Sequence, residues 1–420
     1  GKGKSRAPAA RLSRAMNHRR TCDLDMAKMR RRILWGTAFL LLVLVGLGIY
    51  TYFIGTRTLL EYAEGFSFRR MSVNRLADQG TYRFFYMTNR VRGAADGAVE
   101  ERFGSEREAS LKFGSFDIAF EPTLGVGMLI NPSDWLLNDA IQVKNVQTLQ
   151  RESLVSQLRE QVQASPKRSL LVVVHGFREA YASALRKTAF LGHVLDIDTP
   201  VLLFDWPGDQ GSSLRGYRRA RAVARASGAE LAATLELIVE EVEPGRLWLM
   251  ANSMGAQVVV DAFSLLYRDA DFSDAQTEIE NVVLTAADVD HQRFNEQFKN
   301  EIKALAENVT VYVSSNDRAL LVSRVINRGK RLGESTLDPS NPSQEEQTAS
   351  LSELLEPGDE QLVLVDVTPV NRTRNFHNFS LETPEFFDDL FLRFTGTELP
   401  QTRELYLLQT PRGGRYFVLT

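Results

Sequence analysis

Short, unbroken apolar runs recur along the chain from Ser169 onward. They lack the strict alternation of a strand with one wet face, so each predicts a strand buried on both faces of a parallel sheet. Segments with helical spacing lie between most of them, as in the apolar stripe of Leu231, Leu235 and Ile238. We therefore expect a doubly wound α/β fold with a mostly parallel sheet, whose ligands bind beyond the carboxyl ends of the strands. The expected strands are Leu170–Val174, Val201–Phe204, Leu247–Met250, Val282–Thr285, Val309–Val313 and Leu362–Val367.

Further elements are expected on both sides of this region. Before it, the pattern predicts strands at Thr81–Met87 and Ser110–Phe120 and a helix over Val146–Val162. After it, a turn rich in proline and glycine separates Leu405–Leu408 from Tyr416–Leu419, which is typical of a terminal hairpin.

Shifts in composition divide the chain into parts. The stretch 330–361 is polar and rich in Ser, Glu and Pro, which predicts a mobile insertion that could act as a lid. The predicted organisation is a basic N-terminal tail (1–32), a transmembrane helix (33–54), an N-terminal extension (55–165), an α/β core (166–398) and a C-terminal hairpin (399–420).

The segment Ile33–Ile54 carries no charge and follows three arginines. As a helix it would be about 33 Å long, enough to cross the hydrocarbon core of a bilayer. A cleaved signal peptide would have a shorter apolar region and an A-x-A-like site, which we do not find, so an uncleaved signal-anchor is expected. Because basic flanks stay in the cytoplasm, the residues after Gly55 should lie on the other side of the membrane.

Composition narrows the function classes. With 44% apolar and 25% charged residues, the chain resembles a globular protein with a core. Its net charge of −3 gives no argument for nucleic acid, and no such partner is expected. Cys22 is the only cysteine, so no disulfide framework, thiol nucleophile or cysteine-based metal site is expected. Met26 fits as a translation start, in which case Cys22 is lost.

The clearest candidate for chemistry is Ser253. It follows an apolar run and precedes a segment with helical spacing, which predicts a serine at the apex of a sharp strand–turn–helix elbow. Such a turn needs small residues two positions before and after the serine, and these are Ala251 and Gly255. The elbow would expose the hydroxyl and direct the backbone N–H of Met254 at a developing oxyanion. An ordinary strand–helix turn would give the same pattern.

A serine nucleophile needs a base, and the chain has five histidines. His18 lies in the basic tail and His193 within a helical stretch. His175 and His291 each follow a core strand, before and after the serine respectively. His377 follows the last core strand, and it fits the order serine, acid, histidine found along α/β-hydrolase chains.

The acid should lie on a loop after a strand, between Ser253 and His377. Asp317 fits after Val309–Val313, and Asp288, one strand earlier, is the alternative acid. Either could instead be the N-cap of a helix, a purely structural role.

The second oxyanion donor is expected on the loop after the first core strand. Here His175-Gly176-Phe177 places a glycine where the backbone must approach the substrate, so the N–H of Phe177 would pair with that of Met254. We expect His175 to brace this loop rather than act as the base.

Five segments together resemble an α/β-hydrolase: VVVHGF, FDWPGDQGS, ANSMGAQ, VYVSSNDRAL and FHNF. With FFYMTNR and LKFGSFDIAF upstream, they are most similar to a poorly characterised bacterial branch that is esterase- or lipase-like. The residue before the nucleophile is usually His in that branch and is Asn252 here. The resemblance implies a bacterial protein, so the anchor predicted at Ile33–Ile54 would lie in the inner (cell) membrane, with the catalytic domain on the periplasmic or extracytoplasmic side.

The sequence thus predicts a membrane-anchored serine hydrolase with the triad Ser253, Asp317 and His377 and the oxyanion donors Phe177 and Met254. Its substrate would be a carboxylic ester or another acyl compound, either a small molecule or a lipid, and no metal or organic cofactor is implied. Two alternatives stay open. One is a membrane-tethered scaffold that keeps the fold without activity, and the other is an acyltransferase with the same triad.

Overall fold

The computed structural model describes residues 32, 34–45, 73–76, 80–93, 97–120, 141–269, 272, 279–336, 344–373, 376–396, 405–410 and 413–420. The chain divides into two compact units, Gly1–Glu61 and Tyr62–Thr420, and each is described by itself.

In the first unit, residues 34–45 form an exposed helix. Within the described residues, no helix combines the length and the hydropathy that crossing a membrane requires. The predicted span Ile33–Ile54 extends past this helix into residues outside the described part, so the transmembrane helix stays a prediction.

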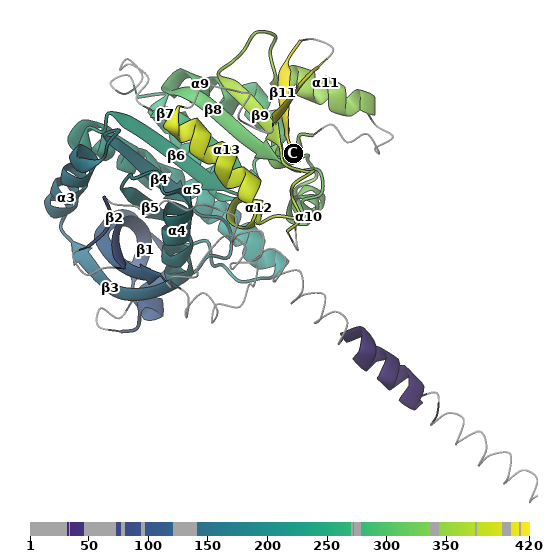
Figure 1. Cartoon of the computed structure of the whole chain (residues 1–420), viewed down its shortest axis with the longest axis horizontal. Coiled ribbons are helices and arrows are strands. Elements are labelled where there is room, and N and C mark those ends of the chain that lie inside the picture. The colour runs from purple at the N-terminus through teal and green to yellow at the C-terminus, as the bar shows by residue number, and fades with distance from the viewer. Residues whose placement is uncertain are drawn as a thin grey trace, which may run out of the picture. The chain divides into compact units, whose positions relative to one another are not determined.

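A mostly parallel sheet is the framework of the second unit (Figure 1). Its strand order is β10-β11-β9-β8-β7-β6-β4-β5-β1-β2-β3. All neighbours from β1 to β11 along that order pair in parallel, whereas β2 and β3 pair antiparallel beside β1 and β10 pairs antiparallel with β11. The strands are β1 (Thr81–Arg92), β2 (Phe103–Phe120), β3 (Ile141–Leu149), β4 (Ser169–Val174), β5 (Val201–Asp205), β6 (Arg246–Asn252), β7 (Ile279–Thr285), β8 (Ala306–Val313), β9 (Leu362–Asp366), β10 (Leu405–Gln409) and β11 (Arg415–Leu419).

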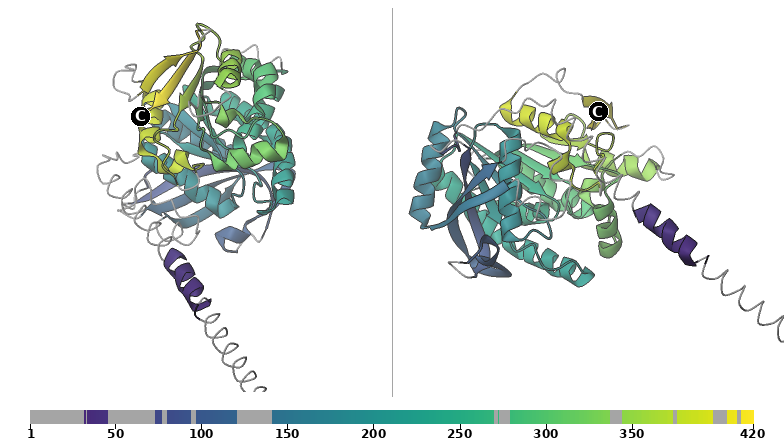
Figure 2. Two further views of the ribbon diagram at one scale, coloured as in Figure 1. Left: turned by 90° about the vertical axis from the view of Figure 1, so that its right-hand side faces the viewer. Right: turned by 60° about the horizontal axis from the view of Figure 1, so that its bottom comes forward.

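Helices cover both faces of this sheet (Figure 2). The α-helices are α3 (Arg151–Ala164), α4 (Tyr181–Leu195), α5 (Leu214–Leu237), α6 (Gly255–Leu266), α8 (His291–Arg293), α9 (Lys299–Leu305), α10 (Arg318–Asn327), α11 (Gln344–Leu354), α12 (Phe379–Glu382) and α13 (Pro384–Thr395). The short helices are η1 (Val99–Glu101), η3 (Ile238–Val242), η4 (Phe294–Phe298) and η5 (Leu332–Glu334). The predicted doubly wound α/β fold is confirmed.

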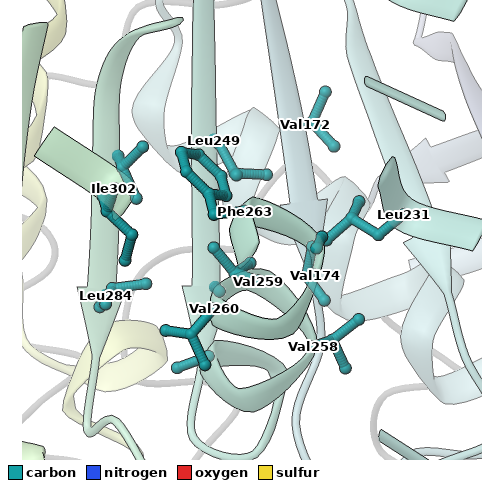
Figure 3. Packing of buried hydrophobic residues seen from close by; sticks show 14 of the residues in the cluster. Val172, Val174, Leu231, Leu249, Val258, Val259, Val260, Phe263, Leu284 and Ile302 are labelled. Carbon is teal, nitrogen blue, oxygen red and sulfur yellow. The ribbon is translucent and has the colours of Figure 1, made fainter. Parts of the chain in front are cut away.

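The two faces carry separate hydrophobic cores because side chains alternate along each strand. Val172 and Val174 of β4 point to the face covered by α3, α5, α6 and α9, while Leu171 and Val173 point to the face covered by α4, α12 and α13. Figure 3 shows α6 lying on the first of these faces, with Val259 among the side chains packed there. A strand of this kind is apolar throughout, which is why the sequence runs lacked alternation.

Two sequence predictions need correction. The helix expected over Val146–Val162 begins only at Arg151, because the preceding residues form β3, which pairs with β2 and buries Val146. The insertion predicted at 330–361 contains η5 and α11, and Leu351 and Leu354 of α11 are fully buried. Its residues 337–343 lie outside the described part.

The terminal hairpin forms as expected, and it extends the sheet. β10 pairs antiparallel with β11, and β11 lies parallel beside β9. At the other edge, β1 of the N-terminal extension pairs in parallel with β5. Neither end of this unit is an appendage, because both contribute strands to one sheet.

Candidate active site

Ser253 lies between the end of β6 and the start of α6, where the chain reverses from strand to helix. Its backbone has φ +54°, in the left-handed region that side chains other than glycine avoid. The turn is held by two hydrogen bonds: the N–H of Ser253 donates to the carbonyl of Thr285 (2.8 Å), and its carbonyl accepts from the N–H of Asp288 (3.0 Å). Such strain costs about 1–3 kcal/mol and persists only where neighbouring contacts fix it.

The elbow needs small residues because β4 and the loop after it pass directly against it. A Cβ added at Gly255 would lie 2.4 Å from the carbonyl oxygen of His175 and 2.7 Å from that of Val174. On the other side of the serine, Ala251 is completely buried. Space, rather than backbone conformation, therefore requires glycine at position 255.

The structure brings Ser253, His377 and Asp317 together. Nε2 of His377 lies 2.9 Å from Oγ of Ser253, and Nδ1 lies 2.7 Å from Oδ2 of Asp317. Asp317 is fully buried, and its other oxygen accepts the N–H of Leu320 (3.0 Å) as the N-cap of α10. The two roles considered for this acid, helix cap and partner of the histidine, are thus filled by one carboxylate.

The surroundings of His377 raise its pKa. Burial alone would lower that pKa, but the charge of Asp317 and the hydrogen bond to it outweigh the burial. Because the ionised carboxylate is an acceptor, Nδ1 must donate to it. In the neutral ring, Nε2 is then left as the acceptor of the Ser253 hydroxyl.

The oxygens of Asp288 are held by other groups. Oδ1 accepts from Arg331 (2.7 Å) and Ser323 (2.6 Å), and Oδ2 accepts from Tyr217 (2.7 Å). The two ring nitrogens of His377 instead lie against Asp317 and Ser253. This geometry favours Asp317 over the alternative acid.

One of the two expected oxyanion donors directly follows the serine, and the other lies on the loop after β4 that approaches it. In the part of the chain that the structure describes, the N–H groups of Phe177 and Met254 donate no hydrogen bond. Gly176 brings the first of them close, since a Cβ there would come within 3.2 Å of the Ser253 Cβ. Two free donors beside a hydroxyl are the arrangement that stabilises a tetrahedral oxyanion.

His175 braces this loop, as expected, and does not reach the serine. Its Nδ1 lies 2.9 Å from the carbonyl oxygen of Gly176 and its Nε2 3.0 Å from Oδ1 of Asp205. Its ring stacks on Trp206, with centroids 5.5 Å apart. The indole N–H of Trp206 in turn donates to the carbonyl of His175 (2.8 Å).

Behind these loops lies Arg90, a residue that sequence reasoning missed. Its completely buried guanidinium comes from β1 and donates to two carboxylates, Asp205 (2.8 Å) and Asp209 (2.6 Å). It also donates to the carbonyls of Glu179 (2.7 Å), Trp206 (2.9 Å) and Gly104 (3.1 Å). All five of its N–H groups are therefore used. The available signal was an arginine three positions after the apolar run FFYM.

A cavity of about 610 Å³ opens above Ser253 and His377. Its wall is mixed: Tyr217, Ile326 and Leu381 are largely apolar, while Lys187 and Glu179 form an ion pair. Among the described residues, no group of three or more His, Cys, Asp or Glu side chains is placed to hold a metal ion.

Asn252, the residue before the candidate nucleophile, also borders the cavity. Its Oδ1 accepts from the hydroxyls of Thr285 (3.0 Å) and Ser380 (3.3 Å). It thus joins the nucleophile elbow to α12, the short helix that follows His377.

Comparison with known proteins gives one family. A family model described as an alpha/beta hydrolase of unknown function (DUF900) matches residues 150–388. No curated protein matches the chain.

Several solved structures are similar to the chain at low identity. A zinc-bound cold-adapted esterase from an Arctic intertidal metagenomic library is 13% identical, with 78% of this chain and 99% of that chain covered and a TM-score of 0.34. A lipase-esterase related protein from Clostridium acetobutylicum is 13% identical, with coverage of 55% and 94% and a TM-score of 0.27. Esterase B from Lactobacillus rhamnosis is 12% identical, with coverage of 55% and 75% and a TM-score of 0.28.

Close to His377, α12 holds an acid in an unfavourable environment. Glu382 is 3% exposed, and within the described residues its Oε2 has no hydrogen-bond partner. Burial raises the pKa of Glu382 to about 7, against the opposing effects of Asn378 and Lys187. Between its ordinary value of 4.5 and about 7, the folded state therefore keeps a proton that the unfolded chain releases.

We predict that Glu382 makes the protein less stable as the pH rises through this window. Because folding must hold the proton, the free energy of unfolding falls by about 3 kcal/mol between the two pKa values. Glu382→Gln should remove most of this loss, raising the urea midpoint relative to wild type at pH 8 and far less at pH 5. Glu106→Gln, at an exposed position of β2, is the matched control. An equal gain at both pH values would contradict the prediction.

Proposed function

We propose that this chain, which belongs to the alpha/beta hydrolase family DUF900, cleaves carboxylic esters as a serine hydrolase. The observation that carries the proposal is the position of His377, with one ring nitrogen on the hydroxyl of Ser253 and the other on the carboxylate of Asp317. A serine hydroxyl is a weak nucleophile at neutral pH, and this geometry supplies both a base and a group that orients the base.

The first half of the reaction forms an acyl-enzyme. Oγ of Ser253 attacks the ester carbonyl carbon as its proton passes to Nε2 of His377, and the carbonyl oxygen becomes an oxyanion facing the N–H groups of Phe177 and Met254. The carbon–oxygen bond to the leaving group then breaks, and the imidazolium returns the proton to the departing alkoxide. Asp317 stabilises the imidazolium while it carries the charge.

The second half releases the acid. Water attacks the acyl carbon, with His377 again taking a proton. The bond to Oγ of Ser253 then breaks in the collapse of the second tetrahedral species, and the imidazolium returns the proton to Oγ. The products are a carboxylic acid, an alcohol and the regenerated serine. If an alcohol or amine replaced water in this step, the same residues would act as an acyltransferase.

We also propose that residues 33–54 anchor the protein in the bacterial inner membrane with Tyr62–Thr420 on the periplasmic side. The support is the uncharged sequence Ile33–Ile54 and the arginines that precede it.

The nucleophile is tested with a fluorophosphonate probe, which forms a covalent bond to an activated serine. Wild-type protein should be labelled, and Ser253→Ala should abolish labelling and lower ester turnover by several orders of magnitude while the circular-dichroism spectrum stays unchanged. Ser212→Ala is the matched control, because Ser212 borders the same cavity. Folded wild-type protein that never reacts would favour the scaffold alternative.

The two acids are separated by their amide variants. Asp317→Asn should lower kcat/KM by roughly 10⁴-fold through a wrong tautomer of the histidine, with little loss of stability because Asn is an equally good N-cap. Since the base must be neutral, wild-type activity should rise with pH through the raised pKa of His377, and the remaining activity of the variant should rise at lower pH. Asp288→Asn should lower kcat/KM far less. The opposite order would transfer the acid role to Asp288.

The anchor is tested by fusing alkaline phosphatase, which is active only outside the cytoplasm, after Thr420. The full chain should give phosphatase activity and remain with the membrane fraction, and deletion of residues 33–54 should remove both properties. Recovery of the intact full chain in the soluble fraction would overturn the proposed anchor without affecting the triad.

A further inference from the structure

The beginning of α5 is strongly basic. The stretch 210–225 contains five arginines and no acidic residue, in a chain whose net charge is −3. Arg215, Arg218, Arg219 and Arg225 are exposed, and Arg221 is half-buried. This half of the helix is therefore a local concentration of positive charge.

A second basic stretch runs through α10 and the loop after it. Residues 318–331 contain five cations and again no acidic residue. Arg331 is completely buried and paired with Asp288, whereas Arg318, Arg324 and Arg328 are exposed. Among the exposed arginines, Arg324 lies 3.6 Å from Glu334.

These two stretches lie side by side in the fold. The hydroxyl of Tyr217 in α5 lies 2.9 Å from Oγ of Ser323 in α10, and Asn327 of α10 contacts both Tyr217 and Arg221. Burial lowers the pKa of Arg221, and the charges of Arg331 and Arg225 lower it further. The positive charges are thus close enough to repel one another.

Exposed aliphatic side chains lie among these arginines. Leu214 and Val322 are 48% and 59% exposed, and both border the cavity above Ser253. Val325, which is 76% exposed, follows Val322 on α10. The spacing of Arg318, Val322 and Val325 places them in one stripe along the helix.

We propose that this face of the molecule docks on an anionic lipid bilayer, so that the cavity mouth opens onto the lipid surface. The docking face consists of Leu214, Arg215, Arg218, Arg318, Val322 and Val325. Guanidinium groups bind lipid phosphates, and aliphatic side chains at the same level enter the boundary between headgroups and acyl chains. Nucleic acid would satisfy the arginines alone and leave the aliphatic groups in water. If the proposed serine hydrolase function holds, the esters cleaved at Ser253 are those of lipids in that bilayer.

The test places an environment-sensitive fluorophore on the docking face of the full chain. In a Cys22→Ser background, Val325→Cys carries the fluorophore, and Leu265→Cys, 44% exposed at the end of α6, is the matched control position. The protein is reconstituted with vesicles of phosphatidylcholine, either alone or with about one third phosphatidylglycerol. With the anionic lipid, the fluorescence emission of the probe at 325 should shift to shorter wavelengths, and the probe should be protected from quenching by acrylamide. High salt should weaken this protection. The probe at 265 should not respond.

Charge reversal measures the contribution of the arginines. The double variant Arg218→Glu with Arg318→Glu should lower the ratio of docked to undocked protein by at least about 25-fold. Each basic residue near an anionic surface contributes about fivefold to that ratio. Arg268→Glu, at an exposed position beyond α6, should leave the ratio unchanged.

Each outcome bears on the proposal. Equal quenching at 325 and 265 on anionic vesicles would overturn it, and protection of 325 by RNA or DNA without lipid would assign the face to nucleic acid instead. The readout needs no catalysis, so Ser253→Ala should dock like wild type. Docking without hydrolysis of the lipids would refute the lipid substrate but not the docking. Hydrolysis of soluble esters without docking would refute the docking but not the proposed function.

Discussion

The buried ion pair between Arg90 and Asp205 is the interaction on which the candidate site depends. Burial would raise the pKa of Asp205, but the charge of Arg90 and the hydrogen bond from His175 outweigh it and keep the carboxyl ionised. A buried pair contributes little net stability compared with apolar packing, yet loss of one partner costs about 3–5 kcal/mol. Its value here is positional, because one planar guanidinium fixes the loop after β4 and the loop after β5 relative to each other.

Arg90 also changes how the N-terminal extension is understood. The family match begins at residue 150, yet the guanidinium that holds the loop of Phe177 comes from β1. β1 lies in parallel beside β5, so Thr88 and Arg90 both reach Asp205. The family region thus depends for its loop geometry on a strand that precedes it in the chain.

Local sequence patterns were sufficient for the core strands and for the residues that meet at Ser253. Chain order and the positions of loops after strands can be read from the sequence. They identified His377 as the candidate base and Asp317 and Asp288 as the two candidate acids. The sequence favoured Asp317 but left Asp288 as an alternative, because the contact that occupies Asp288 comes from Arg331, which lies on a later loop. Arg90 was missed for the same reason, since its partners become neighbours only through strand pairing. Val146 fits a helix and a strand equally, and only pairing with β2 decides for the strand.

Asp317 has two contacts, and they couple the position of α10 in the cavity wall to the pKa of His377. One oxygen of this carboxylate holds the first turn of α10, and the other holds the imidazole of His377. α10 also forms one side of the cavity, through Ile326 among others. Any outward movement of α10 would therefore displace the carboxylate that raises the pKa of His377. The shape of the cavity wall and the pKa of His377 are therefore coupled through one side chain.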